Sequence, residues 1–163
     1  MSVSALTRAA GAKLLCFEIR GQRFGCGLAQ VKETIVVRPI TRVFLTPPWV
    51  SGIINLRGDI VPVLDLAAFL GLGTTVIGGD TRIVIARPGG SPTAGLLVDR
   101  LADVRTVDLG ALEPAPPTLT GEVAALLAGI LTLPGGAPLG VLDLAKLFES
   151  DRLRGLARRT QGA

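Results

Sequence analysis

Two aspartates at matching places in a repeated motif are the residues of this chain best suited to acid–base chemistry. Asp65 follows Ile-Val-Pro-Val-Leu, and Asp143 follows Pro-Leu-Gly-Val-Leu near the C-terminus. Paired carboxylates that share a proton are the catalytic groups of aspartic proteases. Those enzymes require Asp-Thr/Ser-Gly, whereas Leu-Ala follows both aspartates here. Each stands where a short helix is expected to begin, so we interpret Asp65 and Asp143 as helix N-caps.

Other residue types give catalysis no further support. The chain contains no His and no Tyr, so it lacks the commonest general base and any His-ligated metal site. It has no P-loop, and the glycine-rich run at 71–76 lacks the third glycine of the dinucleotide-binding fingerprint. We therefore expect a protein that is not an enzyme and that uses no cofactor.

The two cysteines flank a predicted hairpin whose turn is expected at Gly21-Gln22. That register pairs Phe17 with Cys26. Because side chains alternate between the faces of a strand, Cys16 and Cys26 then point in opposite directions. We expect two buried thiols, as is usual in a reducing cytoplasm, and no disulfide.

The tripeptide Arg57-Gly58-Asp59 is the strongest candidate for a binding feature. It separates two apolar runs, 52–56 and 60–64, which predict a second hairpin. Gly58 supplies the positive φ that a tight hairpin turn needs, so Arg57 must lie at the tip and face outward. Such an arginine is either a bidentate interface anchor or a solvated side chain, and the residues alone favour neither.

The hairpin with Arg57 belongs to a motif that recurs later in the chain in degenerate form. Residues 25–37 align with 95–107 without a gap, which places Glu33 on Asp103. Pro134 stands at the position that corresponds to Arg57. The chain therefore resembles one all-β unit written twice, and only the first copy carries an arginine at the hairpin tip. The other matched positions are Gly52 with Gly129, Asp65 with Asp143, and Pro47-Pro48 with Pro116-Pro117.

Composition and pattern predict an all-β fold. Hydrophobic residues make up 48% of the 163 residues, which is ample for a core, and 21 Gly and 11 Pro favour short strands over long helices. Each copy has about five short strands, which suits a small barrel. We expect the barrels to occupy roughly 14–70 and 80–147, with some strand exchange possible, between flexible tails at 1–13 and 149–163. The expected strands are 14–19, 23–31, 35–43, 52–56, 60–64, 82–86, 94–98, 104–109, 129–133 and 139–142, with a short helix after each motif aspartate.

The net charge of +4 raises the alternative of a basic small-barrel protein that binds nucleic acid. Its cations are scattered, apart from four arginines in 152–159, and aromatic residues make up only 4% of the chain. The stacking platforms of single-strand binders are therefore missing, and we expect no nucleic-acid partner. No apolar run reaches about 18 residues, so we also expect no membrane span.

The run from Gly52 to Leu66, Gly-Ile-Ile-Asn-Leu-Arg-Gly-Asp-Ile-Val-Pro-Val-Leu-Asp-Leu, resembles the signature of the CheW-type chemotaxis coupling proteins. Phe24-Gly25 together with 31–33 resembles the family's first hairpin and its Val-x-Glu. Residues 95–99 with 103–104 resemble its second-barrel Val-Asp segment, and Pro116-Pro117 resembles its Pro-rich connector. The resemblance extends from about Leu14 to Leu147, a CheW-like domain. It implies two SH3-like five-stranded β-barrels packed together, with short helices that include a C-terminal one.

The resemblance also implies a function without catalysis. Such a protein would be a cytoplasmic adaptor that links the tips of methyl-accepting chemoreceptors to the regulatory domain of the histidine kinase CheA, with other CheW-like domains as a further partner. The family's partner-binding positions correspond to Glu33, Asn55, Arg57 and Gly58 in the first barrel, and to Gly95 and Val104 in the second.

Overall fold

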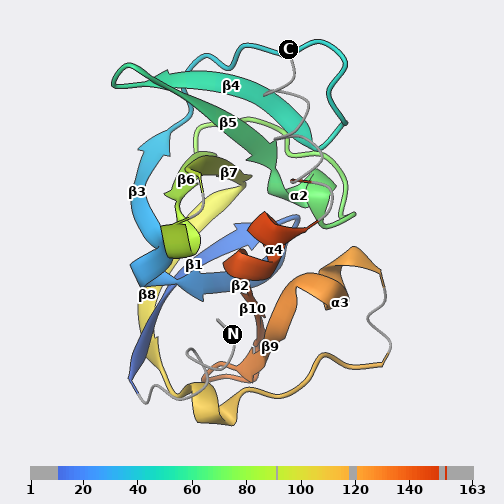
Figure 1. Cartoon of the computed structure of the whole chain (residues 1–163). Coiled ribbons are helices and arrows are strands. Elements are labelled where there is room, and N and C mark those ends of the chain that lie inside the picture. The colour runs from blue at the N-terminus through green and yellow to red at the C-terminus, as the bar shows by residue number, and fades with distance from the viewer. Residues whose placement is uncertain (1–10, 91, 118–120, 151–152, 154–163) are drawn as a thin grey trace.

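The structure is a computed structural model, which describes residues 11–90, 92–117, 121–150 and 153. Its ten strands form two five-stranded sheets, one above the other in Figure 1. We call the upper one the middle barrel, with the order β3 (Val31–Val36), β6 (Arg82–Ala86), β7 (Ala94–Val98), β5 (Asp59–Asp65), β4 (Val50–Leu56). The lower one, the terminal barrel, has the order β8 (Arg100–Val107), β1 (Ala12–Ile19), β2 (Gln22–Gly27), β10 (Pro138–Leu142), β9 (Leu127–Thr132).

The two sheets do not follow the expected boundaries at 14–70 and 80–147. The terminal barrel takes β1 and β2 from the first copy of the motif and the other three strands from the second copy. The middle barrel does the reverse, because β6 and β7 of the second copy lie among β3, β4 and β5. The copies have therefore exchanged their first hairpins reciprocally. β1 begins at Ala12, inside the expected N-terminal tail, and residues 1–10 and 154–163 lie outside the described part.

Corresponding strands occupy corresponding places in the two barrels. In each sheet the single parallel pair joins an exchanged hairpin to its host, β2 with β10 and β7 with β5. Both sheets are closed by a short antiparallel bridge. Thr41 and Ile53 exchange backbone hydrogen bonds of 2.9 and 2.8 Å in the middle barrel, and Glu113 and Ile130 exchange bonds of 2.9 and 2.7 Å in the terminal barrel. The repeat seen in the sequence is thus confirmed as a repeat of structure.

This closing bridge explains why a glycine recurs in the motif. A Cβ on Gly52 would lie 2.2 Å from the carbonyl oxygen of Thr41, and a Cβ on Gly129 would lie 2.5 Å from that of Glu113. Gly52 also has a φ of +145°, which disfavours a side chain. Only glycine lets the two backbones approach closely enough to close each barrel.

Three hydrophobic clusters hold the molecule together. Ile54, Val63 and Ile85 belong to the core inside the middle barrel, and Leu14 and Leu139 to that inside the terminal barrel. The third and largest cluster lies between the barrels and receives side chains from both. Its large members include Phe17, Phe24, Trp49, Phe69 and Leu147. Each barrel therefore buries an outer face against the other, which suits units too small to be stable alone.

The motif aspartates cap short helices, as predicted. Asp65 accepts a hydrogen bond from the backbone N–H of Ala68 in α2 (Leu66–Phe69), and Asp143 from that of Lys146 in α4 (Leu144–Glu149). Both helices contribute to the cluster between the barrels. The other short elements are the helix α3 (Glu122–Leu126) and the 3-10 turns η1 (Leu28–Gln30), η2 (Pro88–Gly90) and η3 (Leu109–Ala111).

Two sequence-based expectations for the first hairpin were wrong in detail. The expected strand 23–31 ends at Gly27, and η1 then carries the chain from the terminal barrel to the middle barrel. The turn is Arg20-Gly21, because both residues have positive φ and the backbone N–H of Arg20 donates to Asp99. Phe17 therefore pairs with Phe24 and not with Cys26.

A register shift of two residues leaves every side chain on its expected face, so the conclusion about the cysteines is confirmed. Both are buried and free; Cys26 lies in the cluster between the barrels and Cys16 in that of the terminal barrel. Burial raises the pKa of the Cys26 thiol to about 12. Burial, together with the nearby Asp103 carboxylate, raises that of Cys16 to about 11.

We expect Gly52→Ala to destabilise the protein by about 2–5 kcal/mol, because the new Cβ meets a backbone oxygen that cannot move without opening the barrel. Thermal unfolding followed by circular dichroism measures this as a lowered Tm. Gly78→Ala is the matched control, since open space surrounds Gly78 and its φ is not positive. A Tm for Gly52→Ala equal to that of the control would contradict the explanation.

We also expect both thiols to be inert in the folded protein. Thiolates form only as the pH approaches the raised pKa values of about 11 and 12, so Ellman's reagent at pH 8 should react slowly. In denaturant the two cysteines of the chain should react rapidly. Fast reaction of either thiol under native conditions would show that its burial is wrong.

Candidate partner-binding site

The site is built on the tight hairpin between β4 and β5. Leu56 pairs with Asp59, so Arg57 and Gly58 form a two-residue turn. Their φ values of +52° and +89° are those of a type I′ turn, which matches the twist of the flanking strands. The side-chain oxygen of Asn55 accepts a hydrogen bond of 2.9 Å from the backbone N–H of Gly58 and fixes the turn. Asn55 and Gly58 thus set the direction in which Arg57 leaves the tip.

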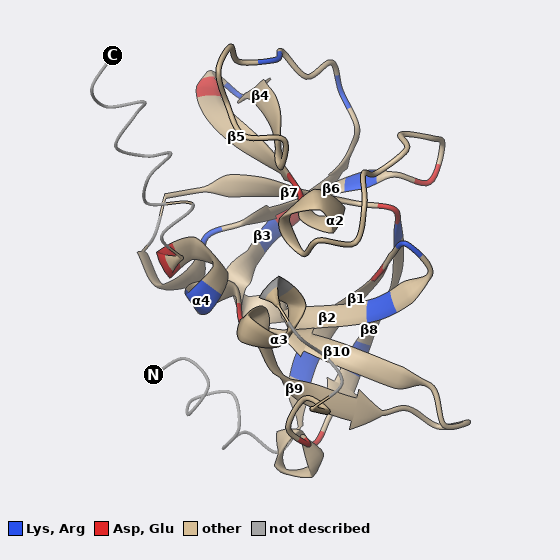
Figure 2. Ribbon diagram, turned by 90° about the vertical axis from the view of Figure 1, so that its right-hand side faces the viewer, with Lys and Arg blue, Asp and Glu red and all other residues tan. Residues whose placement is uncertain are grey.

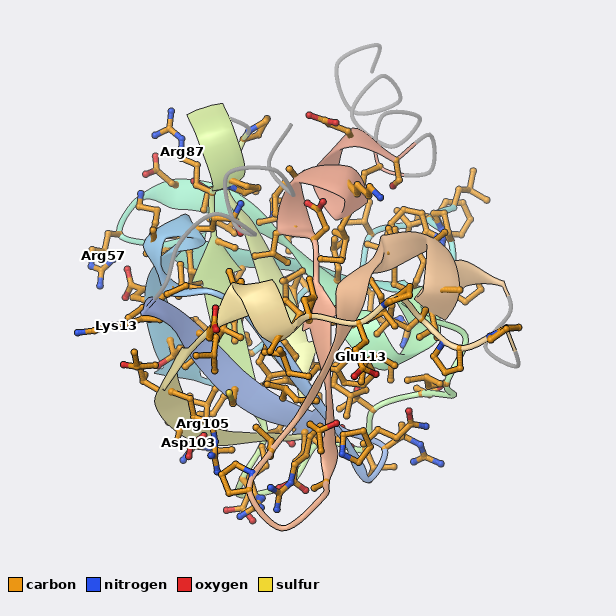
Figure 3. All side chains as sticks on the ribbon, turned by 90° about the horizontal axis from the view of Figure 1, so that it is seen from below. Lys13, Arg57, Arg87, Asp103, Arg105 and Glu113 are labelled. Carbon is orange, nitrogen blue, oxygen red and sulfur yellow. The ribbon has the colours of Figure 1, made fainter. Side chains whose placement is uncertain are left out.

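Arg57 forms a bidentate ion pair with Glu33 on β3. Its Nη1 lies 2.6 Å from Oε2 and its Nη2 lies 2.7 Å from Oε1 of the carboxylate. The side chain of Arg57 nevertheless remains 71% exposed, and that of Glu33 27% exposed. Figure 3 shows Arg57 projecting from the edge of the molecule. The pair ties the free end of a hairpin to a strand that is 24 residues away in the chain, and leaves the guanidinium accessible.

The electrostatics of the pair follow from this contact. The hydrogen bonds from Arg57 lower the pKa of the Glu33 carboxyl, and the nearby charges of Lys32 and Arg38 act in the same direction. Glu33 in turn raises the pKa of Arg57. Both groups are therefore charged throughout the physiological range of pH, and the surface is a fixed arrangement of charges.

The structure adds residues that the sequence did not single out. Arg38 donates a hydrogen bond of 3.0 Å to the backbone oxygen of Asn55 and so joins the segment after β3 to β4. Ile60, which pairs with Asn55 across the hairpin, is 62% exposed. Val36 on β3 is also 62% exposed. Large aliphatic side chains that face solvent from a strand would have pointed to this surface. They cannot be recognised from the sequence until the pairing register of the strands is known.

The two remaining positions were both expected in the second barrel, but the structure places them in different barrels. Gly95 is buried on β7 of the middle barrel, where a Cβ would lie 2.7 Å from the Cγ2 of Ile83. Val104 is on β8, in the terminal barrel, and is 52% exposed. The structure therefore brings together Glu33, Asn55, Arg57 and Gly58 on one surface. It buries Gly95 within the same barrel and places Val104 on the other barrel.

Comparison with known proteins decides the family. The model of the CheW-like domain matches residues 13–152. The chain belongs to the CheW-like domain family. The chemotaxis protein CheW of Treponema pallidum is 32% identical over 152 residues, which cover 89% of this chain and 86% of that protein. Protein FrzA of Myxococcus xanthus is 31% identical over 148 residues, which cover 90% of this chain and 91% of that protein.

The fold is shared as well. The crystal structure of the scaffolding protein TtCheW from Thermoanaerobacter tengcongensis superimposes with a TM-score of 0.77 at 32% identity, over 89% of this chain and 92% of that one. The expected CheW-like fold of two SH3-like barrels is confirmed. The CheW-like chain is a non-catalytic scaffolding or adaptor protein of chemotaxis signalling. Within its described residues, no helix is long and apolar enough to cross a membrane.

We expect the carboxyl of Glu33 to titrate below its ordinary pKa of 4.5, and to return toward that value in Arg57→Gln. Because the pKa is lowered in the folded state, the ion pair is intact at and above pH 4.5 and is lost as the pH falls through the lowered pKa. NMR titration of the Glu33 side-chain carbon measures both values. Identical titration in the two proteins would show that the ion pair does not form in solution.

Proposed function

We propose that this chain couples chemoreceptors to a CheA-type histidine kinase in the cytoplasm. It would contact the receptor's cytoplasmic tip and the regulatory domain of the kinase, and could also contact other CheW-like domains. The observation that carries the proposal is the bidentate pair of Arg57 with Glu33, at an exposed hairpin tip in a CheW-like scaffold.

The physical argument concerns preorganisation. An exposed ion pair contributes little to folding stability, because solvent screens it and two side chains must be ordered. The same pair is useful at an interface, since it holds a planar guanidinium in one orientation before the partner arrives. Asn55 and Gly58 act with it, because they fix the backbone from which Arg57 projects. These four residues form the partner-binding surface that we propose on the middle barrel.

The positions in the second half of the chain have different roles in this proposal. Val104 has an exposed apolar side chain on the terminal barrel, so it can contact a second partner directly. Gly95 is buried and acts indirectly, since a larger residue there would displace Ile83 in the core beneath the partner-binding surface. Contacts on both barrels would allow one chain to hold two partners at once, and avidity in an array would strengthen modest individual contacts.

We expect Arg57→Ala to weaken binding of the kinase regulatory domain or of a receptor-tip fragment by about tenfold, with a Tm close to that of the wild type. Calorimetric titration of each partner measures the affinity, and kinase activity in a reconstituted receptor–kinase assembly measures coupling. Arg42→Ala is the matched control, because Arg42 is also exposed and has no partner among the described residues. Wild-type affinity of Arg57→Ala for both partners would refute its role.

A charge exchange tests whether the partner contacts the Arg57 guanidinium directly or only requires that the ion pair holds the hairpin in place. Glu33→Arg combined with Arg57→Glu can restore the ion pair with its direction reversed. We expect this double variant to keep the amide hydrogens of the hairpin protected from exchange near the wild-type level. Coupling should remain impaired, because the partner would meet a carboxylate at the position of the guanidinium. Full recovery of coupling would mean that the pair acts only by fastening the hairpin.

A further inference from the structure

The mouth of the terminal barrel contains a charged hollow of about 240 Å³. Cys16, Leu133 and Leu139 belong to its lining and also to the core inside that barrel, so the hollow opens directly above the core. Its charged lining consists of Glu18, Arg23, Arg100, Asp103 and Arg105. The hollow has no part in the surface around Arg57, which belongs to the other barrel.

The repeat shows what this hollow corresponds to. Asp103 occupies the position on β8 that Glu33 occupies on β3, and both strands lie at the edge of equivalent sheets. In the middle barrel, Arg57 reaches back from the hairpin tip and engages Glu33. In the terminal barrel, Pro134 replaces that arginine, so no side chain from the hairpin tip closes the corresponding mouth with an ion pair. Figure 3 shows Asp103 and Arg105 toward the same side of the molecule as Arg57.

The charges in the hollow do not balance. Glu18 pairs with Arg100, and Asp103 pairs with Arg105 through a single contact of 3.2 Å. Arg23 is exposed and has no hydrogen-bond or ion-pair partner among the described residues. Three cations therefore face two carboxylates, and the unsatisfied charge is positive. A group that completes this site should carry one negative charge.

We propose that the mouth of the terminal barrel binds a carboxylate side chain from an acidic segment of a protein partner. The carboxylate would accept hydrogen bonds from Arg23 and Arg105, while its methylene groups lie against Leu133 and Leu139. The hollow of about 240 Å³ is large enough for one carboxylate side chain and some of its hydration. Each barrel mouth then has an arginine–carboxylate ion pair. It is intramolecular in the middle barrel and intermolecular in the terminal barrel.

We expect the carboxylate to bind weakly and only at this hollow. Arg100 is 54% exposed and Arg105 33% exposed, so solvent screens the site and a single carboxylate contributes little. A short acidic peptide should therefore bind with a Kd of about a millimolar. The site goes beyond the coupling surface proposed for Arg57, because neither its residues nor its barrel is shared with that surface.

An NMR titration with blocked tri-glutamate peptide tests the proposal, with blocked tri-glutamine peptide and inorganic phosphate as matched probes. We expect tri-glutamate to shift amide signals around Cys16, Asp103 and Leu133, and tri-glutamine to leave them unchanged. Arg23→Gln should weaken the binding about two- to fivefold, and adding Arg105→Gln should abolish the localised shifts. Phosphate should bind less tightly than tri-glutamate, since it has no methylene groups to place against the two leucines.

Arg42→Gln separates a specific site from general attraction to a basic protein. It has the same net charge as Arg23→Gln but changes an arginine in the loop before Trp49 that has no partner among the described residues. Tri-glutamate should therefore bind it as it binds the wild type. Equal weakening by both variants, or shifts spread over the whole surface, would overturn the site. Tighter binding of phosphate than of tri-glutamate would overturn the choice of a carboxylate. Arg57→Gln should leave the titration unchanged, so the outcome is independent of the role proposed for Arg57.

Discussion

The structure depends on the burial of one apolar face of each barrel against the other. Neither barrel is made from a continuous half of the chain, because each has received the first hairpin of the other copy. The largest hydrophobic cluster lies at this junction, with Phe17 and Phe24 from an exchanged hairpin and Phe69 from a capped helix. Folding either half alone would leave sheets without their inner strands, so the two barrels must form together.

Because this shared core supplies most of the apolar burial, the residues at the outer ends of the barrels can differ without loss of the fold. The closing bridges at Gly52 and Gly129 are nearly identical, as the geometry of barrel closure demands. The mouths differ. In the middle barrel, Arg57 forms an intramolecular ion pair with Glu33. In the terminal barrel, the mouth contains a hollow with excess positive charge. Figure 2 shows charged residues of both signs distributed over the two barrels.

Several features of the site followed from local sequence. Arg57 and Gly58 stand between two apolar runs of matched length, which defines the hairpin and its tip. Asp65 and Asp143 precede helices, which explains both without catalysis. The prediction for Cys16 and Cys26 survived a wrong register, because a shift of two residues conserves the alternation of faces. These conclusions needed only turn chemistry, capping and the period of a strand.

By itself, the sequence determined the repeat, the β-rich composition and the position of an unmatched arginine at a hairpin tip. Only the tertiary structure decided that the copies exchange hairpins and that Arg57 binds Glu33. Strand pairing between distant segments depends on which edges meet during folding, and edges of repeated units are nearly equivalent in sequence. The contact of Arg57 with Glu33 joins a hairpin turn to a strand 24 positions away in the chain, so no local pattern specifies it. The buried position of Gly95 likewise emerged only when β7 was found between β6 and β5.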